Sequence, residues 1–109
     1  MTHATLGEFE QLVLLAVLRL GERAYAPAIR AELAGRTGRP PSAGAIYVTL
    51  DRLEAKGLLR SRLGEPPADR GGRARRDVAV TARGLRSLRQ ARAELLGLWQ
   101  GLEGVLDGT

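Results

Sequence analysis

Arginine side chains carry the most distinctive chemistry in this sequence. Ten arginines lie between Arg60 and Arg92 against three acidic residues, whereas residues 93–109 contain three acidic residues and no cation. Guanidinium groups are planar, forked donors that suit phosphate groups and base edges. A general preference for arginine over lysine would explain the residue type but not the clustering. The cluster therefore predicts a surface that binds a polyanion.

The densest part of this cluster surrounds the pair Gly71 and Gly72. Glycines let a loop turn tightly and approach another molecule closely, and guanidinium groups supply the counterion-releasing contacts that dominate non-specific affinity for nucleic acids. The alternative is a charged run that only faces solvent. Because the run falls at the tip of a predicted loop, we favour DNA contact by four side chains: Arg70, Arg73, Arg75 and Arg76.

The chain lacks the residues that most catalytic and metal sites use. It has no cysteine, and its one histidine, His3, lies beside the N-terminus. Ser42, Tyr47 and the carboxylates have no adjacent base, metal-ligand set or phosphate-binding loop, so an enzyme is the least supported class, and we expect no cofactor and no metal. The sequence has no apolar run long enough to span a membrane and no signal-peptide pattern. This predicts a cytoplasmic protein without a membrane partner.

Periodicity, caps and breakers predict the elements that carry these residues. Apolar spacing predicts a helix over 8–20. Pro27 suits the first residue of a second helix that Gly38 can end, and Ser42 can cap a third helix that ends at Gly57. Alternation over 58–63 and 77–80 predicts two strands, and Thr81 can cap a final helix. A chain of 109 residues has room for one core. The predicted fold class is mainly α with a small β-hairpin, a winged helix-turn-helix of three helices, a two-stranded wing and a C-terminal dimerisation helix.

The third predicted helix has an unusually small outer face. If Ile46, Leu50 and Leu53 face the core, helical geometry places Gly44, Val48, Asp51 and Ala55 on the opposite side, flanked by Tyr47 and Arg52. Small side chains allow close approach to a DNA groove, and hydroxyls can contact phosphates or base edges. The predicted DNA contacts on this helix are Ser42, Gly44, Tyr47, Val48 and Arg52.

Alternatives stay open for three of the polar side chains on this helix. Asp51 would repel phosphate, so we expect it to pair with a nearby arginine rather than to contact DNA. Tyr47 could pack on the hairpin instead of facing DNA. Arg52 could be the surface ion-pair partner of Glu32 or Glu54.

Apolar residues beyond the needs of one small core predict a second subunit. The helix over 8–20 is apolar around most of its circumference, and a heptad seam runs along the last helix to Leu106, with Arg92 as its one polar member. We predict that residues 1–81 form the DNA-binding part and that 82–109 form a dimerisation helix of the same compact domain. The expected interface residues are Leu12, Leu15, Leu88, Leu95, Trp99 and Leu102.

Several segments resemble one family of bacterial regulators. The stretches LGEFEQLVLLAVLRL at 6–20, GAIYVTLDRLEAKGLL at 44–59 and RGGRARR at 70–76, followed by Val80 and Thr81, are similar to the PadR family of winged-helix regulators, in its short subgroup with a single C-terminal helix. The resemblance implies a homodimeric repressor that binds double-stranded DNA at a pseudo-palindromic operator. It also implies release by a small hydrophobic or aromatic effector beside Trp99, although Trp99 as a seam residue needs no ligand to explain it.

One departure from the family bears on the wing. Relatives often carry an aromatic pair where this chain has Asp77 and Val78, so we expect a hairpin that is less firmly anchored. Two other functions remain as alternatives: a winged-helix module for protein interaction, in which the basic loop binds an acidic partner, and a small RNA-binding protein. A promoter footprint would exclude the first alternative, and competition between duplex RNA and duplex DNA would test the second.

Overall fold

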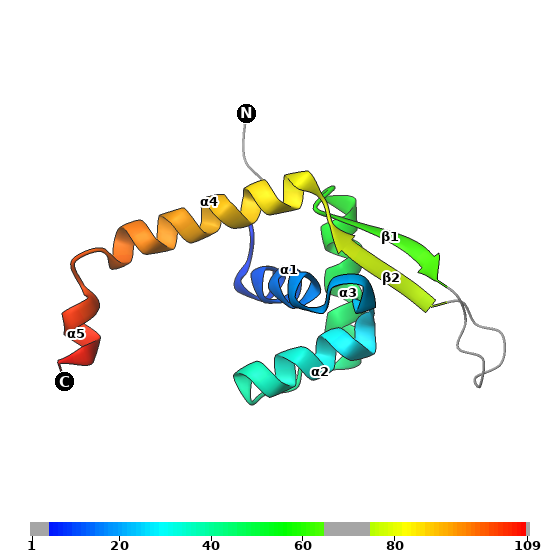
Figure 1. Ribbon diagram of the computed structural model, residues 1–109, viewed down its shortest axis with the longest axis horizontal. Coiled ribbons are helices and arrows are strands. Elements are labelled where there is room, and N and C mark those ends of the chain that lie inside the picture. Colours follow the sequence, from blue (N-terminus) through cyan, green and yellow to red (C-terminus); the bar gives the residue numbers. More distant parts are fainter. Residues whose placement is uncertain (1–4, 65–74, 109) are drawn as a thin grey trace.

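The elements follow the predicted order of three helices, a hairpin and a C-terminal helix (Figure 1). The computed structural model describes residues 5–64 and 75–108. Their bounds are α1 Glu8–Leu20, the short 3₁₀ helix η1 Gly21–Arg23, α2 Ala26–Thr37, α3 Ala43–Ala55, β1 Leu59–Gly64, β2 Arg75–Val80, α4 Ala82–Trp99 and α5 Glu103–Asp107. This arrangement is a winged helix-turn-helix, which confirms the predicted fold class.

The core lies where α1, α2 and α3 meet the hairpin. Its largest fully buried side chains are Val13, Leu14, Ile29, Ile46, Leu50, Leu53 and Leu58. Leu14 lies outside the apolar stripe that periodicity predicts for the helix over 8–20, yet it is fully buried, because α1 is covered on more than one side within a single chain. Leu15 and Leu18 on α1 remain exposed. Only part of the apolar circumference of α1 is therefore available to a second subunit.

Two side-chain caps fix the starts of α3 and α4. The Ser42 hydroxyl accepts a hydrogen bond from the Ala45 N–H at 3.1 Å, and the Thr81 hydroxyl accepts one from the Gly84 N–H at 3.0 Å. The Thr81 N–H also donates to the Leu58 carbonyl. Gly84 lies so close to this carbonyl and to Val80 that a Cβ atom would overlap both. Glycine is therefore required at the point where the base of α4 meets the hairpin.

The hairpin is anchored to the body of the protein through β2. Its strands pair antiparallel from Leu59 opposite Val80 to Gly64 opposite Arg75. Val78 is buried in the core, and its N–H donates to the Ala24 carbonyl at 2.9 Å. Val78 and this backbone hydrogen bond therefore anchor the second strand without the aromatic pair that relatives often carry.

The C-terminal helix is shorter than the heptad pattern predicts. α4 ends at Trp99, Gly101 adopts a φ of 86°, and the separate helix α5 follows. Leu102 and Leu106 therefore do not continue the seam of α4, because Gly97, Gly101 and Gly104 lower helix propensity in a segment with little support from the body. Figure 1 shows the distal half of α4 extending beyond the three-helix body. The radius of gyration is 16.1 Å, against about 13 Å for a compact chain of this length.

Candidate nucleic-acid interface

The start of α3 presents an open surface that the rest of the described chain does not cover. Tyr47 is 48% exposed and Val48 is exposed beside it. A methyl group added at Gly44 would meet no described atom beyond its own helix within 4 Å. Exposure of this extent favours the outward interpretation of Tyr47 over packing on the hairpin. The Ser42 hydroxyl, which accepts its bond from Ala45, keeps its proton free to donate.

Arg52 lies exposed on the same helix. Neither of its predicted ion pairs forms, because both carboxylates have other partners: Glu32 binds Arg36 at 3.0 Å, and Glu54 binds Arg76 at 2.7 Å. The ion-pair interpretation of Arg52 is therefore wrong for the described residues. Its charge remains available on the α3 surface.

Arg76 connects the wing to α3. One guanidinium nitrogen lies 3.0 Å from Asp51 Oδ1 and another lies 2.7 Å from Glu54 Oε1. The pairing expected for Asp51 is therefore confirmed, and its partner comes from β2. Hydrogen bonds from the Ser61 hydroxyl and from Arg76 hold the pKa of Glu54 below its ordinary value. Burial opposes the charge of Arg76, but its bonds to the two carboxylates raise its pKa, so the guanidinium stays protonated in this contact.

Arg75 also has partners within the protein. Its guanidinium lies 4.7 Å from the centre of the Tyr25 ring and 2.8 Å from Asp77 Oδ1. The sequence prediction missed both partners. No local pattern links Tyr25 to a strand fifty positions later, whereas Asp77 is only two positions from Arg75 and its spacing on one face of a strand could have indicated the pair. The other two predicted wing contacts, Arg70 and Arg73, lie outside the described residues.

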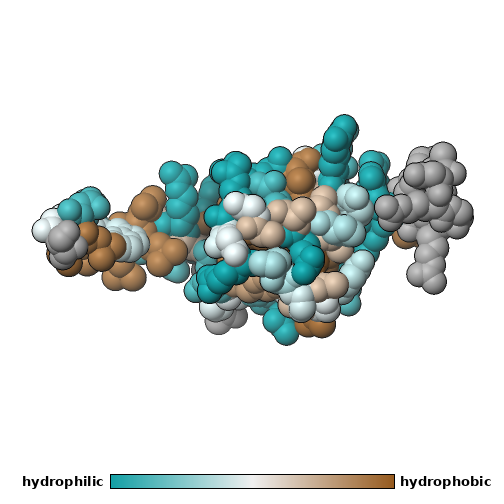
Figure 2. All heavy atoms as spheres, turned by 90° about the horizontal axis from the view of Figure 1, so that it is seen from below, coloured by the Kyte–Doolittle hydropathy of each residue, from teal (hydrophilic) through white to brown (hydrophobic). Residues whose placement is uncertain are grey.

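The predicted interface residues divide into two groups. Leu12 and Leu88 are partly buried against the core of their own chain, whereas Leu15, Leu95, Trp99 and Leu102 are exposed. Figure 2 shows apolar side chains gathered on the arm that α4 and α5 form. The exposed large apolar residues of this arm are Leu95, Leu96, Leu98, Trp99, Leu102, Val105 and Leu106. Gly84 is the one buried residue of α4.

A buried ion pair that the sequence analysis missed holds α1 against the end of α3. Glu10 is 5% exposed, and its carboxylate accepts bonds from the Lys56 ammonium at 2.8 and 3.0 Å and from the Gly7 N–H at 2.8 Å. Burial alone would raise the pKa of Glu10, but these donors hold it below its ordinary value. The two partners lie 46 positions apart, so helical spacing gives no signal for their contact.

No helix within residues 5–64 and 75–108 has the length and apolarity to span a membrane. No curated protein sequence matches this chain. Among solved structures, a PadR family transcriptional regulator from Eggerthella lenta is similar at 33% identity over 94% of this chain and 88% of its own, with a TM-score of 0.68.

Two more distant structures share the fold. A PadR-like transcriptional regulator from Bacillus cereus is 22% identical, with 93% of each chain covered and a TM-score of 0.70. A PadR family regulator from Clostridium difficile is 20% identical, with 92% of this chain and 96% of its own covered and a TM-score of 0.66. The model of the PadR-like family of transcriptional regulators matches residues 14–90. The chain therefore belongs to the PadR-like family and is a transcriptional regulator rather than an enzyme.

Proposed function

We propose that this regulator is a homodimeric repressor that binds double-stranded DNA at a pseudo-palindromic operator. The observation that carries the proposal is the open face at the start of α3, where Ser42, Gly44, Tyr47 and Val48 lie uncovered by the described residues. A helix with such small outward side chains can enter a major groove closely. Cations at its edge, including Arg52 and the wing arginines Arg70 and Arg73, would contact the phosphates.

In this proposal, the arm formed by α4 and α5 makes the dimer interface. Its apolar side chains stay exposed in one chain, and contiguous apolar surface of this kind marks interaction sites. Two copies joined through α4 would present two α3 helices to successive major grooves. The 43% exposed ring of Trp99 fits such an interface, and it is also where the small hydrophobic or aromatic effector implied by the family resemblance would bind.

A footprint on the DNA upstream of the protein's own gene tests the proposed function. We expect protection of a pseudo-palindrome whose half-sites lie about one helical turn apart. Binding that is equally strong on every duplex would contradict specific recognition and favour the protein-interaction module. Stronger competition by duplex RNA than by duplex DNA would favour an RNA-binding protein.

Replacement of Tyr47 by alanine should separate specific from non-specific binding. Because the ring and hydroxyl of Tyr47 face outward on α3, we expect Tyr47→Ala to weaken operator binding by about 10-fold, in the range of one lost base-edge contact. Affinity for unrelated duplex DNA should change less than about 2-fold. Tyr47→Phe keeps the ring, so its operator affinity compared with that of the wild type measures the contribution of the hydroxyl. Equal losses on operator and unrelated DNA would place Tyr47 on the backbone instead.

Arg76 should act on DNA binding through its carboxylate partners. Arg76→Gln leaves Asp51 and Glu54 unneutralised on the α3 surface, and we expect about 5- to 10-fold weaker binding to any duplex. The triple variant Asp51→Asn, Glu54→Gln, Arg76→Gln removes the repulsion and should recover the wild-type affinity with an unchanged salt dependence. If Arg76 itself binds phosphate, the triple variant will instead show a slope of affinity against salt that is lower by about one.

A further inference from the structure

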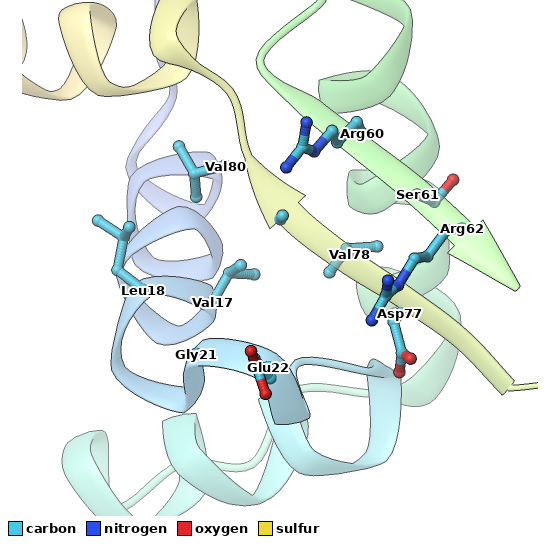
Figure 3. Close-up of a pocket in the computed structure, with 11 residues that line it drawn as sticks. Val17, Leu18, Gly21, Glu22, Arg60, Ser61, Arg62, Asp77, Val78 and Val80 are labelled. Carbon is cyan, nitrogen blue, oxygen red and sulfur yellow. The ribbon is translucent and has the colours of Figure 1, made fainter. Parts of the chain in front are cut away.

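A pocket of about 660 Å³ lies between the end of α1, η1 and the outer face of the hairpin (Figure 3). Small-molecule sites in proteins commonly measure roughly 300–1,000 Å³. Val17 and Val78, both buried in the core, line the pocket together with Val80, and Leu18 adds an apolar wall that is 45% exposed. Leu18, Ala79 and Val80 therefore supply the apolar surface that stays accessible in this pocket.

Two arginines border this apolar lining, on the hairpin face that they share with Asp77 and Ala79. Arg60 and Arg62 alternate along β1 and so lie on one face of the hairpin, and Figure 3 shows both reaching toward the pocket. Ser61 points the other way and donates to Glu54 on α3. Within residues 5–64 and 75–108, neither arginine has a hydrogen-bond or ion-pair partner, so both guanidinium groups are free to bind a ligand.

The carboxylates around the pocket do not cancel this charge. Asp77 is paired with Arg75 at 2.8 Å. Glu22 on η1 is the one lining carboxylate without a partner in the described part of the chain. The lining has two arginines and two carboxylates, and Arg75 beside it adds a third cation, so the charges around the pocket sum to +1. The combination of an apolar lining and a positive rim is suited to a molecule with an apolar body and one anionic group.

We propose that this pocket binds a small amphipathic monoanion. Its apolar body lies on Leu18, Ala79 and Val80, and its carboxylate or sulfonate accepts hydrogen bonds from Arg60 and Arg62. A DNA backbone fits less well, because phosphates gain nothing from an apolar wall and these arginines lie on the hairpin face opposite the one that contacts α3. This site is separate from the interface around Trp99.

Occupancy of the pocket can affect the wing. The ligand would contact α1 and η1 on one side and both strands on the other, while Arg76 ties the same hairpin to α3. A bound anion therefore favours one position of the wing relative to α3. This regulatory consequence rests on the proposed function, whereas the binding itself does not and can be measured without DNA.

The test titrates the full chain with 8-anilinonaphthalene-1-sulfonate in the absence of DNA and follows its fluorescence and the backbone amide shifts. We expect shifts at Gly21, Ala79 and Val80. N-phenyl-1-naphthylamine, which lacks the sulfonate, should bind this site at least about 10-fold more weakly, since its charge-assisted hydrogen bonds are lost. The double variant Arg60→Gln, Arg62→Gln should lower the affinity for the sulfonate by a similar factor.

Two further variants keep the result interpretable. Arg89→Gln removes an exposed cation from α4 and should leave the affinity unchanged. Leu18→Glu introduces a negative charge at an exposed wall position, where folding is little affected, and should also weaken binding. Shifts confined to α4 and α5, or equal affinity in the double variant and in Arg89→Gln, would overturn the proposal. So would a double variant that loses DNA affinity but binds the sulfonate normally. If the wild-type protein does not recognise an operator, the proposed function is wrong, but the titration without DNA still tests the pocket.

Discussion

Replacing Leu95 and Trp99 with glutamate should convert the protein into a monomer and abolish operator binding. Both side chains lie exposed on the arm of α4 in one chain, and we propose that the second subunit covers them. Two buried, unpaired charges per chain should raise the dimer dissociation constant by at least about 100-fold. Sedimentation at micromolar concentration should then give the 11.7 kDa chain mass instead of twice that mass.

A matched control makes the same leucine-to-glutamate change outside the proposed interface. Leu63 is an exposed leucine at the far end of β1, and Leu63→Glu should leave the oligomeric state unchanged. Helical content should be preserved in all variants, because the replaced side chains contribute little to the core. A wild-type chain that sediments as a monomer would refute the proposed interface directly.

Replacing Lys56 with methionine should cause the largest loss of stability. The ammonium is the charged partner of a carboxylate that is 5% exposed, so its removal leaves a buried, unpaired charge on Glu10. Breaking a fully buried pair costs about 3–5 kcal/mol. Because the Lys56 side chain is itself 30% exposed, solvent screening reduces the expected loss to about 2 kcal/mol. Urea unfolding at one fixed protein concentration measures it, and Lys56→Arg should retain most of the stability.

The same pair gives stability a defined dependence on pH. The folded-state pKa of Glu10 is lowered, so the pair stabilises the protein above the ordinary pKa of glutamate and this contribution is lost as the pH falls through the folded-state value. In Lys56→Met, burial without a partner raises the pKa of Glu10, and that variant gains stability as the carboxyl protonates. The difference in unfolding free energy between wild type and variant should therefore shrink between pH 7 and pH 4. A constant difference would contradict the role of Glu10.

Local signals predicted the order of elements well. Ser42 and Thr81 cap helices as expected, and Gly38 ends α2 with a φ of 74°. Pro27 is the second residue of α2, one position later than predicted. Each of these features depends on a few neighbouring residues, so the sequence alone contains the information. The outward face of α3 follows from helical periodicity for the same reason.

Features that depend on distant contacts could not be predicted. The Glu10–Lys56 pair and the stacking of Arg75 on Tyr25 join segments that only the fold brings together. For Asp51 the sequence predicts an arginine partner but does not identify it as Arg76, and DNA contact by Arg76 stays a prediction. The low helix propensity of Gly97, Gly101 and Gly104 predicts a weak distal half of the last helix, but the heptad pattern does not show that α4 ends at Trp99.

The close approach at Gly84 gives the molecule a mechanical property. The base of α4 packs closely against the Leu58 carbonyl, and this 18-residue helix is about 27 Å long. A tilt of 10° at the base would displace the far end by about 5 Å. A displacement of this size would change the distance between the two α3 helices and so the half-site spacing that the dimer fits. In the proposed dimer, the packing at Gly84 would thus set the tilt of α4 and, through it, the distance between the two α3 helices. That position is far from any side chain that contacts a base.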